Sequence, residues 1–88
     1  AYNEVGNALV KYRNCLKLID EYDMATSNAR EFLLLSLDLY TRGLSPYSDV
    51  ATAQQDLLSY NNSLIVARGD ALSSLVSLYE ALGGGFQQ

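Results

Sequence analysis

Apolar and small residues recur along this chain at alternating steps of three and four, the spacing of side chains on one face of an α-helix. Each half of the chain sustains this repeat over about five heptads, which is typical of coiled-coil packing. The repeat consists of two interleaved seven-residue series in each half: Val5, Tyr12, Ile19, Thr26, Leu33 and Tyr40 with Ala8, Cys15, Tyr22, Ala29 and Ser36, then Val50, Leu57, Leu64, Ala71 and Leu78 with Ala53, Tyr60, Ala67, Ser74 and Ala81. We call these positions the seam and predict that they hold two long helices together.

The residues that break the pattern gather at one internal place, Arg42-Gly43-Leu44-Ser45-Pro46. Gly43 suits the left-handed conformation that ends a helix. Ser45 is placed to cap the next helix, and Pro46 suits the first helical position, where its missing N–H is no loss. The sequence therefore predicts helix 1 over about residues 1–42, a tip turn at 43–46 and helix 2 from about residue 46. Because the connection is short, the helices should be antiparallel, which makes the fold an all-α hairpin.

A second interruption is predicted at Gly83-Gly84-Gly85, because consecutive glycines lose backbone entropy in a helix. We therefore expect helix 2 to end near residue 82 and a Gly-rich tail to occupy 83–88. The chain has no initiator Met and begins within a helical pattern, so we expect a fragment of a longer protein.

A second apolar stripe runs beside the seam. It is formed on the later helix by Leu58, Ile65, Leu72 and Tyr79, flanked by Leu75 and Leu82, and on the earlier helix by Leu9, Leu16 and Leu37. A two-helix hairpin needs only one apolar seam, so a second one predicts neighbours on two sides. A larger bundle, a sheet of helices and an oligomer would each supply them, and we expect the isolated segment to self-associate.

Composition and candidate chemistry argue against several classes of function. A net charge of -4 with few clustered cations is unsuited to binding nucleic acid. The chain has no His and one Cys, which rules out a Cys–His pair and an intrachain disulfide. Asp20, Glu21 and Asp23 form an acidic cluster, but adjacent helical positions point in different directions. We therefore expect no catalytic residue, no cofactor and no metal site, and we do not expect an enzyme or a piece of one.

Several short motifs carry a resemblance to a known family. They are Glu4-Val5 with Asn7-Ala8-Leu9, Tyr40-Thr41-Arg42-Gly43, the block from Tyr47 to Ser59 containing Ala53-Gln54 and Leu57-Leu58, Ala67-Arg68, and the block from Leu78 to Phe86. Together they cover nearly the whole chain, which resembles the C-terminal helical hairpin of the TolC-like outer-membrane efflux factors. The chain departs from the family pattern at Phe86, where Trp is usual, at Ala51 and Thr52, where Leu and Asp are common, and at Pro46.

The resemblance implies a role and a location. In that family three protomers form a tunnel, with a β-barrel in the outer membrane and an α-helical barrel in the periplasm of a Gram-negative bacterium. The segment would be part of the helical barrel, in a passive export conduit of a tripartite pump with a periplasmic adaptor (membrane fusion) protein and an inner-membrane transporter. The tip residues Arg42, Gly43, Leu44, Ser45, Pro46 and Tyr47 match the loop that contacts the adaptor. Tyr40 and Asp49 match positions that help to close the channel gate.

One alternative remains open on the sequence alone: a structural or scaffolding coiled-coil hairpin that mediates protein–protein association and has no part in transport. Such a protein would show the same heptads and the same turn. The sequence upstream would separate the two hypotheses, because a channel protein would carry amphipathic β-strands and a second helical half there.

Overall fold

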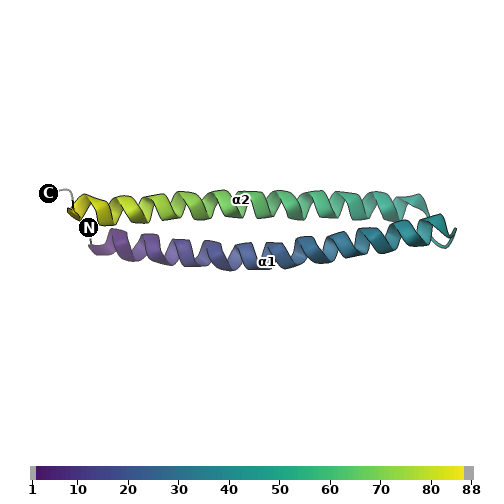
Figure 1. Ribbon diagram of the computed structural model, residues 1–88, viewed down its shortest axis with the longest axis horizontal. Coiled ribbons are helices and arrows are strands. Elements are labelled where there is room, and N and C mark those ends of the chain that lie inside the picture. The colour runs from purple at the N-terminus through teal and green to yellow at the C-terminus, as the bar shows by residue number, and fades with distance from the viewer. Residues whose placement is uncertain (1, 87–88) are drawn as a thin grey trace. The chain divides into compact units, whose positions relative to one another are not determined.

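Two long helices make up nearly all of the chain. The computed structural model describes the backbone of residues 2–86 and the side chains of residues 4–83. Helix α1 spans Tyr2–Thr41 and helix α2 spans Tyr47–Phe86, joined by one turn (Figure 1). The described residues contain no strand, which confirms the prediction of an all-α hairpin. None of the described helices is long and apolar enough to cross a membrane.

The chain divides into two units, and each contains a stretch of both helices. Unit 1 comprises residues 1–20 and 65–88, so the first half of α1 packs against the second half of α2. Its seam is built from small residues: Cys15, Ala67, Ala71 and Ser74 are all buried. The Cys15 Sγ atom lies 3.8 Å from the Ser74 Oγ atom, which fixes the level at which the two antiparallel stretches meet.

Unit 2 comprises residues 21–64 and contains the turn. Its most deeply buried residues are Val50 and Ala53, both with no exposed surface. Leu64 and Ala29 complete the apolar part of this seam, and the hydroxyl-bearing residues Thr26 and Ser36 are buried beside them. Most of the buried positions in this unit are therefore filled by small side chains.

The seam prediction is confirmed, because every buried residue in the described part of the chain belongs to the predicted series. Two members of the predicted series are nevertheless exposed: Tyr40 is 43% and Tyr60 is 41% exposed. A tyrosine ring is wider than the seam between two helices, so part of it reaches water at the rim.

The predicted end of the second helix is wrong. Helix α2 does not stop near residue 82 but continues through the three glycines to Phe86. Extending an existing helix adds one hydrogen bond for each residue fixed, so propagation tolerates a glycine that nucleation would not. The other boundaries differ by one residue, with α1 ending at Thr41 and α2 beginning at Tyr47. Of the predicted Gly-rich tail, residues 87–88 lie outside the described residues.

Candidate functional site

The turn that joins the helices is a well-ordered helix cap. Gly43 has a φ of 76°, which is the left-handed conformation predicted for it. The Gly43 amide donates to the Tyr40 carbonyl at 3.0 Å, and the Leu44 amide donates to the Leu39 carbonyl at 2.8 Å. This pair of hydrogen bonds defines a Schellman motif, which satisfies carbonyls that would otherwise be unpaired at the helix end. The backbone at the tip is therefore held in one conformation.

A side chain also helps to close the end of α1. The Thr41 Oγ1 atom donates to the Leu37 carbonyl at 3.0 Å and to the Asp38 carbonyl at 2.8 Å. Both acceptors belong to the last turns of α1, and the Asp38 carbonyl also accepts the Arg42 amide at 3.1 Å. Sequence reasoning missed this role of Thr41, although Thr near a helix end is a known source of such bonds.

The start of α2 lies one residue later than predicted. We predicted Ser45 as the cap and Pro46 as the first helical residue, but the helix begins at Tyr47. The Pro46 carbonyl accepts the Asp49 amide at 3.2 Å, so Pro46 occupies the capping position itself. Proline suits that place because it has no amide N–H that would need a partner. Ser45 lies between Leu44 and Pro46 and is half-buried.

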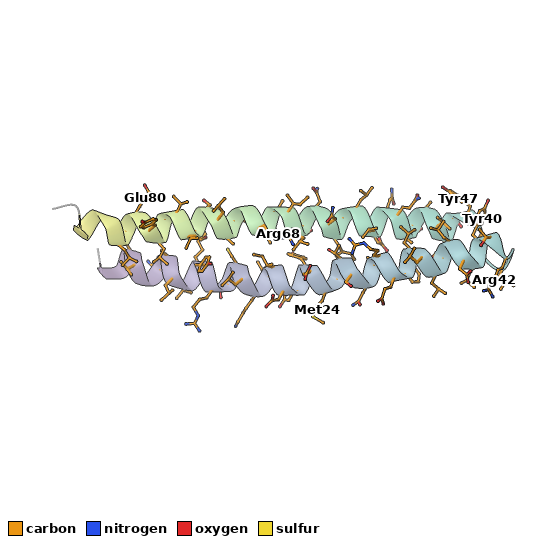
Figure 2. All side chains as sticks on the ribbon, in the orientation of Figure 1. Met24, Tyr40, Arg42, Tyr47, Arg68 and Glu80 are labelled. Atoms are coloured by element: carbon orange, nitrogen blue, oxygen red, sulfur yellow. The ribbon has the colours of Figure 1, made fainter. Side chains whose placement is uncertain are left out.

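Two tyrosines pack against each other across the turn. The ring centroids of Tyr40 and Tyr47 are 5.3 Å apart with an interplanar angle of 69°, an edge-to-face arrangement. Figure 2 labels both residues near the turn. Tyr40 belongs to the last turn of α1 and Tyr47 is the first residue of α2, so this contact ties the two helix ends together. Such aromatic pairs contribute about 0.5–1.5 kcal/mol beyond the burial of their area.

Charged side chains surround the turn without being buried. The Arg42 Nε atom lies 3.3 Å from the Asp38 Oδ2 atom, and both side chains are more than half exposed. Asp49 is exposed in the first turn of α2, where its charge favours the positive end of the helix dipole. The Asp38–Arg42 pair was not predicted, although its i,i+4 spacing on a helix was visible in the sequence.

The structure thus brings the predicted tip residues and both predicted gate residues into one small region. Leu44 is 69% exposed and Tyr47 is 53% exposed at its surface. Among the described residues no three side chains of the metal-binding types come together. The tip therefore combines an ordered backbone with exposed apolar side chains and a few charges.

Both units also carry exposed apolar residues away from the tip. The predicted second stripe of α2 is open in this single chain: Leu58 is 69%, Leu72 63% and Tyr79 75% exposed. Exposed apolar residues scattered singly are normal, but a row of them along one helix marks a surface that another element covers.

Fold and site together define a class: an all-α helical hairpin with an ordered turn and an exposed apolar stripe on its second helix. The model of the outer membrane efflux protein family matches residues 1–84. The chain belongs to that family, which is one of transport channel components and not of enzymes.

Two relatives from Pseudomonas putida give the same result. The solvent efflux pump outer membrane protein SrpC of that species is 30% identical over 86 residues, which are 98% of this chain and 18% of the relative. The toluene efflux pump outer membrane protein TtgI, from the same species, matches with the same identity and the same coverage. The chain therefore spans about a fifth of the length of these relatives. No solved structure matches it with significance.

Proposed function

We propose that this chain is a periplasmic segment of an outer-membrane efflux channel, one hairpin of a helical barrel through which a tripartite pump exports its substrates. The channel is a passive conduit, formed by three copies of the full-length protein. The segment itself carries out no chemistry. Its helices form part of the tunnel wall, and its turn forms part of the tunnel tip.

The observation that carries this proposal is the second apolar stripe on α2. Leu58, Ile65 and Leu72 recur at heptad spacing, and each is more than half exposed when the hairpin stands alone. A helix in a closed barrel has a neighbour on each side, so it needs a second seam to pack against the next hairpin. A two-helix hairpin that packs against no other protein surface needs only the first seam. The family to which the chain belongs supports the same role.

The ordered turn supports a role for the tip in contacting a periplasmic adaptor protein. The Schellman cap and the Tyr40–Tyr47 contact hold residues 42–47 in one conformation before any partner binds. A surface that is ordered in advance loses less conformational entropy on binding. We assign the adaptor contact to Arg42, Gly43, Leu44, Ser45, Pro46 and Tyr47.

We assign the channel gate to Tyr40 and Asp49. Asp49 is exposed on the first turn of α2, so three copies around a channel axis would form a ring of carboxylates that attracts cations. Tyr40 packs against Tyr47, so a movement that opens the tip would have to change or break this aromatic contact.

A scaffolding hairpin without a transport role is the alternative, and the exposed apolar stripe would serve it equally well. The match of the efflux family over residues 1–84 favours the channel. The two hypotheses differ in whether the segment supports export, which a chimera tests directly.

In the chimera, this chain replaces the matching 86 residues of the toluene efflux pump outer membrane protein TtgI. Survival of P. putida on toluene is then measured in a strain whose own copy is deleted. We expect the chimera to restore a large part of the tolerance. A chimera that assembles in the outer membrane and confers no tolerance would contradict the channel role.

The same chimera tests the tip. Gly43→Pro should abolish tolerance and cross-linking to the adaptor, because proline cannot adopt the φ of 76° found at this position. Gly43→Asn is the matched control, since asparagine tolerates the left-handed conformation, and it should retain both. Equal tolerance in the two variants would show that the tip conformation is not used.

A further inference from the structure

The two flanks of the seam in unit 1 differ in character. One flank carries an open groove lined by Glu4, Asn7 and Ala8 of α1 and by Ser77, Glu80 and Ala81 of α2. Four of these residues, Glu4, Asn7, Ser77 and Glu80, directly precede a seam residue in the sequence. Because they come from both helices and line one groove, residues that precede a seam residue lie on the same flank of both helices. This flank is mostly polar, and its two large apolar members in unit 1 are Leu18 and Val66.

Residues that directly follow a seam residue lie on the opposite flank, because consecutive helical residues are about 100° apart around the axis. In unit 1 this flank is largely apolar and exposed. We call it the apolar flank of unit 1. Its large apolar members are Leu9, Leu16, Ile65, Leu72, Leu75, Tyr79 and Leu82, and its charged members are Arg13, Asp20 and Arg68. Arg13 is long enough to keep its guanidinium in water while its stem lies on this flank.

The contact between Cys15 and Ser74 tells which members of this flank share a level. Both helices rise by about 1.5 Å per residue in opposite directions, so five residues forward on α1 match five residues back on α2. Asp20 is therefore level with the neighbourhood of Arg68. By the same count, Leu16 is level with Leu72, and Leu9 is level with Tyr79.

We propose that a second copy of this chain packs on the apolar flank of unit 1, related by a two-fold axis parallel to the helices. In this arrangement α1 of one copy lies on α2 of the other at the same level. Leu16 then meets Leu72, Leu9 meets Tyr79, and Asp20 meets Arg68, each contact occurring twice. The inference concerns the 88-residue chain itself and goes beyond its role in a channel.

The charges favour a second copy over an unrelated partner. Arg68 is the only cation of α2 and is exposed. Among the residues whose side chains are described, the one ion pair joins Asp38 to Arg42, so Arg68 forms no ion pair with Asp20 or any other of these residues. A second copy supplies Asp20 at the right level, and apolar side chains cover apolar side chains next to it.

The area of the apolar flank of unit 1 indicates a small interface and hence a weak dimer. The described part of α2 in unit 1, residues 65–83, is roughly 28 Å long, and two adjacent helices are roughly 20 Å wide. Contact over such a face buries on the order of 1,100 Å² in total, the lower end of specific interfaces. We therefore expect a weak dimer with a dissociation constant on the order of tens of micromolar.

Sedimentation equilibrium of the 88-residue chain tests the proposal. The wild type should change from monomer to dimer as its concentration rises from about 1 to about 300 μM. Arg68→Glu should raise the dissociation constant about tenfold, because it sets two carboxylates against each other at two symmetric sites. Asp20→Arg should do the same, and the double variant Arg68→Glu/Asp20→Arg should return close to the wild-type value.

Lys11→Glu is the matched control, because it changes the net charge as much as Arg68→Glu does. Lys11 directly precedes the seam residue Tyr12, so it lies on the polar flank and its replacement should leave the dimer unchanged. Helix content from circular dichroism checks that each variant is folded. A wild type that stays monomeric up to about 300 μM overturns the proposal, as does a double variant that is no tighter than either single one.

Cross-linking tests the direction of packing. Leu16→Cys and Leu72→Cys are placed in separate chains that both carry Cys15→Ser, and the mixture is oxidised with diamide. We expect the disulfide to join the two different variants. A disulfide that forms only between two copies of the Leu72→Cys chain would overturn the arrangement, because the axis places those residues on a diagonal.

Discussion

Glycine ends one helix of this protein and not the other. At Gly43 the chain turns into the left-handed region and α1 stops. At Gly83, Gly84 and Gly85 three consecutive glycines occur in α2, yet the helix continues to Phe86. The two regions contain the same residue type and differ in what surrounds it.

The difference lies in the partners that the turn supplies. After Gly43, the Leu44 amide returns to the Leu39 carbonyl, and Pro46 then gives its carbonyl to the next helix. The helix bonds lost at the turn are thus replaced by others. The glycines of α2 follow Ala81 and Leu82 and keep a helical backbone, and the described residues show no turn hydrogen bonds there of the kind found at Gly43. A glycine permits a helix to end, and the residues after it decide whether it does.

The largest expected effect comes from replacing Gly43 by a residue that cannot adopt the left-handed conformation. Gly43→Pro forces φ to about −65° and deletes the amide that donates to Tyr40, so the Schellman cap is lost. We expect the free energy of unfolding to fall by about 3 kcal/mol. Thermal unfolding of the 88-residue chain, at a concentration where it is monomeric, measures the change. A loss below about 1 kcal/mol would mean that the tip backbone does not need a left-handed residue.

A pair of alanine substitutions compares the two glycine regions directly. At both Gly43 and Gly83, an added Cβ atom would meet no other atom within 4 Å, so sterics with neighbours do not enter. Gly43→Ala should still destabilise by about 1–2 kcal/mol, because alanine is strained at a φ of 76°. Gly83→Ala should stabilise by about 0.5–1 kcal/mol, because alanine is the better helix former.

Urea denaturation of the two variants should therefore show changes in the free energy of unfolding with opposite signs. If both substitutions stabilise the chain, then Gly43 is not held in the left-handed conformation in solution. If both destabilise it, then α2 is not helical at Gly83 in solution.

These contrasts also show how far the sequence reaches. The seam was predictable because burial between two helices depends only on a seven-residue period, and all ten buried residues, from Cys15 to Ser74, obey it. The left-handed conformation of Gly43 was predictable because Ser45 and Pro46, which follow it, indicate the start of another helix. The predicted end at Gly83–Gly85 was wrong because a low intrinsic helix propensity does not end a helix unless a turn replaces the lost hydrogen bonds.

The candidate site was less predictable than the fold. The residues of the tip were found from their turn chemistry, but the Tyr40–Tyr47 contact was not, because it depends on side-chain rotamers across the turn. Tyr40 also illustrates a limit of periodicity. Its place in the repeat predicted a seam position, whereas 43% of it is exposed, because a tyrosine ring is wider than the seam between two helices.

The contact between Tyr40 and Tyr47 is a second feature of the tip that Gly83–Gly85 lacks, and its expected contribution to stability is smaller. A double-mutant cycle with Tyr40→Ala, Tyr47→Ala and the double variant isolates the energy of the pair from the rest of each side chain. We expect a coupling energy of about 1 kcal/mol, in the range for edge-to-face aromatic pairs. A coupling near zero would leave the Schellman cap as the only element that distinguishes the tip.

The smallest expected effect is that of the ion pair beside the tip. Arg42 lies 3.3 Å from Asp38 at i,i+4 spacing, but both side chains are mostly in water. Asp38→Asn should therefore cost only about 0.2–0.5 kcal/mol, and the cost should vanish at high salt, where the Debye length shortens to about 3 Å. Asp70→Asn, an exposed carboxylate in the interior of α2, is the matched control for the loss of one charge. A cost above about 1 kcal/mol that persists in salt would mean that Arg42 is fixed in place by this pair, and the tip would then owe its order to charge as well as to its backbone cap.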